Sequence, residues 1–77
     1  MRMKAIEALR AIMERNGIKF SVLMDRLGIK SNALANRLSR ENITIGRLVE
    51  MARALDYKIV MVPRDTRLSS DWFEVDQ

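Results

Sequence analysis

Apolar residues recur every three to four positions along the first two-thirds of the chain, and this spacing predicts four α-helices. Gly17 and Gly28 follow the first two helices, where glycine ends a helix because it readily adopts a positive φ. Ser31 and Thr44 are good N-caps for the third and fourth, since a hydroxyl oxygen accepts a backbone N–H of the first turn. The predicted helices span residues 2–15, 19–27, 31–39 and 45–55.

The pattern changes after Asp56, where residues 57–63 predict a β-strand that ends at Pro63. Both faces of this strand are apolar, so it needs cover on both sides and a partner for its backbone. The same strand of a second copy, paired antiparallel about a two-fold axis, supplies that partner. The alternative is packing on the chain's own helices, with residues 72–75 as a weak second strand. The residues predicted at the dimer interface are Tyr57, Ile59, Val60, Met61 and Val62.

The chain has 77 residues and is expected to form one small domain in three parts. These parts are a helical domain over residues 1–56, a dimerisation strand over 57–63 and an acidic tail over 64–77. Residues 1–64 carry 13 Lys and Arg against 6 Asp and Glu, a net charge of +7, whereas residues 65–77 carry a net charge of −3. A basic body favours an anionic partner, with ordinary surface charge as the alternative.

Composition argues against several classes of function. The sequence contains no cysteine and no histidine, which removes disulfides, the usual zinc sites and histidine acid–base catalysis. No nucleophile is paired with a base, so we expect neither catalysis nor a metal or cofactor. No apolar run approaches the roughly 20 residues of a membrane-spanning helix, so a cytoplasmic protein without a membrane partner is expected.

The third predicted helix carries the candidate chemistry. Asn32 and Asn36 lie one turn apart, on the face opposite the apolar residues Leu34 and Leu38. The major groove of DNA admits an α-helix, where asparagine bonds adenine, arginine bonds guanine and serine bonds either. A solvated polar face is the alternative interpretation. The residues predicted to contact DNA bases are Ser31, Asn32, Asn36 and Arg37.

Further polar and basic residues lie just before this helix or near the start of another. Backbone N–H groups at a helix N-terminus and basic side chains both attract phosphate. For Lys30 an ordinary surface position is an equal alternative, and Thr44 serves first as a helix cap. The residues predicted to contact DNA phosphates are Lys19, Lys30, Arg40, Asn42 and Thr44.

Residues 3–55 resemble the lambda-repressor/Cro-type helix-turn-helix family of phage, plasmid and bacterial regulators. The resemblance rests on the ordered pattern Leu23, Leu27-Gly28-Ile29, Leu34, Thr44, Leu48 and the ending MARALDY. It implies a mainly α, four-helix fold in which residues 30–39 form the recognition helix. The implied function is a homodimeric, sequence-specific repressor that binds an inverted repeat in double-stranded DNA. The chain departs from the family's preferred residue types at Phe20, Met24, Lys30 and Arg37.

The acidic tail contains two adjacent aromatic residues, Trp72 and Phe73. They are expected to fold back onto the domain or onto a neighbouring subunit. The alternative is that they bind a second protein, as the tail of an antitoxin binds its toxin. This alternative function, a protein-binding module, is compatible with DNA binding by the helical part.

Overall fold

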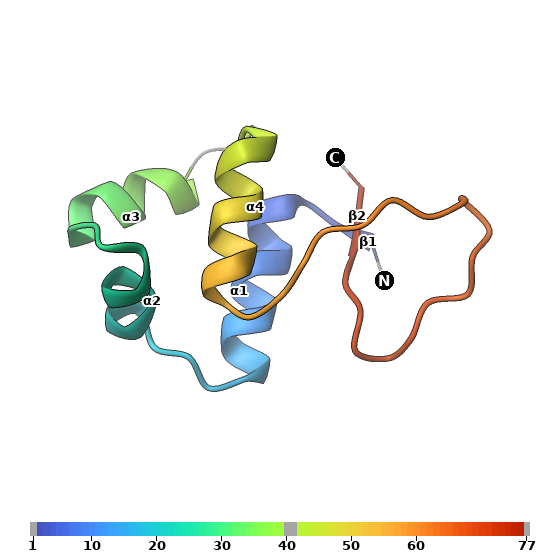
Figure 1. Ribbon diagram of the computed structural model, residues 1–77, viewed down its shortest axis with the longest axis horizontal. Helices are drawn as coiled ribbons and strands as arrows, with labels where there is room; N and C mark the ends of the chain where they lie inside the picture. Colours follow the sequence, from blue (N-terminus) through green and yellow to red (C-terminus); the bar gives the residue numbers. More distant parts are fainter. Residues whose placement is uncertain (1, 40–41, 77) are drawn as a thin grey trace.

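The computed structural model describes residues 2–39 and 42–76, and its described part is mainly α-helical (Figure 1). All four predicted helices are present, with ends that differ from the prediction by at most three residues. Within these two ranges, no helix has the length and apolar character needed to cross a membrane. The elements are β1 (Arg2–Met3), α1 (Ala5–Arg15), α2 (Phe20–Leu27), α3 (Ser31–Ser39), α4 (Ile45–Ala54) and β2 (Glu74–Val75).

Glycines end α1 and α2, as the sequence predicts. Gly17 and Gly28 have φ angles of 63° and 66°, a left-handed conformation that costs glycine little because it has no Cβ. The chain then closes each helix end with a backbone bond. The N–H of Ile18 donates to the carbonyl of Met13 at 2.9 Å, and that of Ile29 donates to Met24 at 3.2 Å.

The predicted cap of α4 is also confirmed, because the Oγ1 atom of Thr44 accepts the backbone N–H of Arg47 at 3.3 Å. The first helix begins later than predicted. The backbone N–H of Lys4 donates to the carboxylate of Glu7 at 2.8 Å, so Lys4 is the cap and α1 starts at Ala5. The residues before it form β1 instead.

One apolar core joins the four helices. Leu23 of α2, Leu34 of α3 and Met51 of α4 are fully buried in one cluster with apolar residues of α1. Burying a side chain of this size stabilises a fold by about 1.5–3 kcal/mol, so these few residues hold α2, α3 and α4 together. The buried core consists of Ile6, Leu9, Ile12, Met13, Leu23, Leu34, Leu38, Met51 and Leu55.

The predicted strand over residues 57–63 does not form in the single chain. Residues 58–62 are irregular and make no hydrogen bond to any other described residue, so nothing in the described part of the chain supplies the ladder that a strand requires. Two short strands form elsewhere in the described ranges, one before α1 and one in the tail. β2 pairs in parallel with β1, with Arg2 opposite Glu74 and Met3 opposite Val75.

The two ends of the molecule carry different segments. α3 lies at one end, α1 and α4 lie in the middle, and the loop after residue 57 extends from the opposite end (Figure 1). The outer face of α3 is therefore separated from the acidic tail by the helical body.

Asp56, the second residue after α4, has a strained backbone, and this predicts an effect on stability. Asp56 has a φ of 64°, which costs any residue other than glycine because its Cβ crowds the backbone. Asp56→Gly is expected to raise the free energy of unfolding by about 0.5–1 kcal/mol, after allowance for the extra entropy of glycine in the unfolded chain. Urea unfolding measures this change. Asp56→Ala is the control, because it removes the carboxylate and keeps the strain; an equal gain in both variants would contradict the backbone explanation.

Candidate nucleic-acid interface

α3 divides cleanly into a buried side and an exposed side. Leu34 and Leu38 are buried in the core, and Arg37 beside them is mostly covered. The opposite side faces solvent and holds only small or uncharged polar side chains. These exposed residues are Ser31, Asn32, Ala35, Asn36 and Ser39.

The two asparagines on this face differ in their hydrogen bonding. The Oδ1 atom of Asn32 accepts the backbone N–H of Ala33 at 3.0 Å, so its carbonyl is already engaged by the helix. The carboxamide of Asn36 makes no hydrogen bond to any residue of the described ranges, although its backbone carbonyl accepts the hydroxyl of Ser39 at 3.0 Å. Asn36 therefore keeps both its donor and its acceptor for a ligand.

Arg37 does not belong to the exposed face. Its guanidinium donates to Oε1 of Glu50 on α4 at 2.7 Å, and its side chain is only 16% exposed. The prediction that it contacts a base needs this bond to break, so Arg37 is better described as a link between α3 and α4. The family pattern expects an apolar residue here, and the ion pair lets an arginine occupy a half-buried position.

The same ion pair sets the ionisation of Glu50. The hydrogen bond from Arg37 lowers the pKa of Glu50 below its ordinary value of 4.5; burial opposes this, and the charges of Arg37 and Arg47 add to it. Arg47 lies 3.6 Å from the other carboxylate oxygen and is 53% exposed. The carboxylate of Glu50 therefore holds both arginines from one position on α4.

The start of α3 agrees with the predicted span, but the residue that caps it does not. The carbonyl of Lys30 accepts the backbone N–H of Leu34 at 3.1 Å, which makes Lys30 the N-cap and Ser31 the first helical residue. The expected capping role of Ser31 is thus wrong, and its hydroxyl lies on the exposed face. The Lys30 side chain is exposed beside the helix N-terminus, in reach of an anion that binds there.

The other residues predicted to contact phosphate are spread around this end of the molecule. Lys19 is exposed and is the N-cap of α2, while Asn42 and Thr44 are exposed in the connection between α3 and α4. The Oγ1 atom of Thr44 is engaged by the cap of α4. Arg40 lies outside the described residues.

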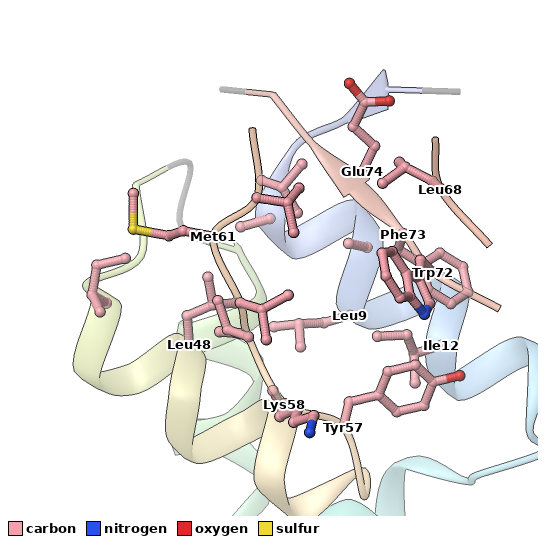
Figure 2. A pocket seen from close by; sticks show the side chains of 18 residues that line it. Leu9, Ile12, Leu48, Tyr57, Lys58, Met61, Leu68, Trp72, Phe73 and Glu74 are labelled. Atoms are coloured by element: carbon pink, nitrogen blue, oxygen red, sulfur yellow. The ribbon is translucent and has the colours of Figure 1, made fainter. Parts of the chain in front are cut away.

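The far end of the molecule carries an exposed apolar surface that sequence reasoning assigned to a dimer. Tyr57 is half-buried, whereas Met61 is 98% exposed. These residues border a hollow of 470 Å³ between α1, α4 and the tail. Figure 2 shows Leu9 and Leu48 reaching into it, with the rings of Tyr57, Trp72 and Phe73 along one side. The remaining exposed residues of the predicted interface are Ile59, Val60 and Val62.

The tail is attached to the domain through α1. Arg15 donates to the carboxylate of Asp71 at 2.6 Å and to the carbonyl of Ser70 at 2.8 Å. Its guanidinium lies 5.9 Å from the ring centre of Phe73, which packs 6.1 Å from the ring of Tyr57. Phe73 therefore folds back as expected, while Trp72 remains 50% exposed.

One exposed residue of α3 was missed by sequence reasoning. Ala35 lies on the outer face, between the two asparagines in sequence. Its side chain has no polar group, and the candidate DNA contacts were chosen for their polar or basic side chains. Its position on the helix, one turn from Ser31 and one from Ser39, is the signal that could have identified it as exposed.

Comparisons of the chain with protein-family models, with curated proteins and with solved structures find no match. Function therefore has to follow from the side chains and their arrangement.

The Arg37–Glu50 pair predicts a specific pH dependence of stability. Because the pKa of Glu50 is lowered in the folded chain, the pair stabilises the fold above about pH 4.5 and loses this contribution as the pH falls through the lowered pKa. Glu50 is 45% exposed, so solvent screening limits the effect to at most about 1 kcal/mol.

Urea unfolding at about pH 7 and about pH 3 tests this expectation. Glu50→Gln should be less stable than the parent chain at the higher pH and equally stable at the lower pH. Glu14→Gln, an exposed glutamate of α1, is the control and should show no pH-dependent difference. A deficit of Glu50→Gln that persists at the lower pH would contradict the role of the charged pair.

Proposed function

We propose that the protein is a transcriptional regulator, most simply a repressor, that binds double-stranded DNA as a homodimer through α3. The observation that carries this proposal is the exposed, uncharged polar face of α3, with the free carboxamide of Asn36 at its centre. A helix with such a face matches the hydrogen-bonding edges of bases in the major groove. The resemblance of residues 3–55 to a helix-turn-helix family supports the same function.

The surroundings of α3 support an approach to DNA. The helix lies at one end of the molecule, and the acidic tail lies at the other (Figure 1). Lys30 at its N-terminus and the half-exposed Arg47 on α4 bring positive charge near it. Phosphates contacted by these groups would fix the register of the helix, while the asparagines would contact the bases.

The homodimer is supported by residues 58–62. Their backbone has no hydrogen-bonding partner among the described residues, and the side chains of Ile59 to Val62 are exposed. A second copy that pairs antiparallel with this segment satisfies the backbone and covers the side chains at once. For a two-fold dimer of this type, the expected separation of the two copies of α3 along the DNA is about one helical turn, roughly 34 Å.

A protein-binding module of the antitoxin type is the second candidate function. It is favoured by the exposed side chain of Trp72 at the rim of the hollow. The product of a co-transcribed neighbouring gene would then protect the tail from proteolysis. Phe73 is already packed on the domain, which leaves Trp72 as the main aromatic contact for such a partner.

Selection from a randomised duplex library at about 150 mM salt tests the main proposal, since lower salt rewards charge alone. An inverted repeat with half-sites about one turn apart is the expected result. Enrichment of no sequence, with only salt-sensitive general binding, would contradict it.

Lys30 is expected to act on phosphate rather than on a base. Lys30→Ala should weaken binding to all duplexes alike and reduce the slope of log affinity against log salt by about 1. Fluorescence anisotropy over a range of salt concentrations measures both effects. Arg67→Ala is the matched control, an exposed basic residue of the acidic tail, and should leave the slope unchanged. An altered base preference in Lys30→Ala would point to a base contact instead.

Met61 is expected to contribute to the stability of the dimer but not to the folding stability of the single chain, because its side chain is 98% exposed. Met61→Glu should convert the dimer to a monomer while keeping the helical circular dichroism spectrum, since two glutamates would meet at the interface. Sedimentation equilibrium measures the mass. Ser21→Glu adds the same charge to exposed α2 and should remain dimeric. A parent chain that is monomeric at high micromolar concentration would contradict the proposed dimer.

A further inference from the structure

The exposed face of α3 consists of two parallel rows of side chains. One row holds the carboxamides Asn32 and Asn36, and the other holds the small residues Ser31, Ala35 and Ser39. No charged side chain lies on this face within residues 31–39, because Arg37 is turned toward Glu50. The face therefore offers amide, hydroxyl and methyl groups, and lacks the guanidinium that most often reads guanine.

The two carboxamides have unequal capacity to distinguish bases. The Oδ1 atom of Asn32 accepts the N–H of Ala33, which directs this oxygen toward the helix backbone, so Asn32 offers a base mainly its N–H donors. Donors alone bond the N7 atom of either purine, so they separate adenine from guanine poorly. Asn36 retains a donor and an acceptor side by side, because its carboxamide has no partner among the described residues.

Adenine is the base whose major-groove edge matches such a pair. Its N7 accepts and its N6 amino group donates, so one carboxamide makes both bonds. Guanine presents two acceptors at the same edge, N7 and O6, and leaves the Oδ1 atom of an asparagine without a donor. A buried, unpaired oxygen costs free energy, so the carboxamide binds adenine in preference to guanine.

We propose that α3 recognises an A·T base pair in each half-site, with Asn36 bonding the adenine and the methyl group of Ala35 contacting a thymine methyl. This inference rests on the DNA-binding function proposed above and specifies its ligand. Ala35 is exposed one residue before Asn36, and its side chain offers only a methyl group. Apolar contact with the C5-methyl group is the interaction that distinguishes thymine from cytosine.

The row of small residues allows α3 to come close enough to the bases for this contact. Ser31, Ala35 and Ser39 have short side chains, so they let the backbone of α3 come close to the floor of the groove. Asparagine is itself short and reaches a base edge only at such a close approach. A longer side chain in place of Ala35 would hold Asn36 away from the adenine.

The test compares the two asparagines on the duplex that selection enriches with the parent protein. Asn36→Ala should lose roughly 5- to 150-fold in affinity and lose its preference at one base pair of each half-site. Replacing the adenine at that pair by 7-deazaadenine, which lacks N7, should weaken the parent protein and leave Asn36→Ala unaffected. Asn32→Ala, the matched control on the same face, should keep the preference for A·T at that pair.

A second base substitution tests the thymine contact separately from the adenine contact. Deoxyuridine in place of thymidine removes only a methyl group and should weaken the parent protein by roughly 4-fold. The same change should have no effect on Ala35→Gly, because the partner methyl is already absent. Circular dichroism checks that each variant is folded, which is expected because all three substituted positions, 32, 35 and 36, are exposed.

The outcomes separate this inference from the function on which it rests. If the parent protein enriches no sequence, the DNA-binding function and the A·T contact both fail. If it enriches an inverted repeat with G·C at the base pair whose preference Asn36→Ala loses, DNA binding stands and the A·T contact is overturned. Loss of the base preference in Asn32→Ala but not in Asn36→Ala would overturn the assignment of Asn36 in the same way.

Discussion

The complete burial of Leu23, Leu34 and Met51 is the constraint on which the rest of the structure depends. These side chains come from α2, α3 and α4, and they share one core cluster with apolar residues of α1. α3 has nine residues, and a helix of this length is not stable alone in water. Its existence and its orientation therefore both follow from the burial of Leu34 and of Leu38 one turn later. The side that remains exposed is fixed by the same contacts.

A second interaction, made with α4, also holds α3 in place. The Arg37–Glu50 ion pair holds α3 against α4 at the edge of the core, where a half-buried guanidinium needs a partner. It also removes the only charged side chain within residues 31–39 from the exposed face. The chemistry left to α3 is that of amides and small side chains, which favours readout of particular hydrogen-bond patterns over general attraction to phosphate.

Sequence patterns predicted the helices well because their signals are local. Periodic leucines, the glycines after α1 and α2, and the cap at Thr44 lie within a few residues of the structure they specify. The hydrogen bonding of the side chains on α3 was predicted less well, because it depends on residues that are distant in the sequence. Nothing near Arg37 in sequence indicates that Glu50, thirteen positions later, binds it. The tail was hardest to predict, because β1 and β2 have two residues each, too few to show alternation, and come from opposite ends of the chain.

The central claim is that the outer face of α3, rather than the apolar surface around residues 57–62, is the part of the chain that meets DNA. Chemical-shift perturbation of the 15N-labelled chain on addition of a duplex tests it most directly. The account predicts that the largest shifts fall on the backbone and side-chain amides of Asn32 and Asn36 and on the backbone amides of Lys30 and Ser31. The amides of residues 58–62 should shift little. Shifts concentrated on residues 58–62 and Trp72, with α3 unaffected, would contradict the account.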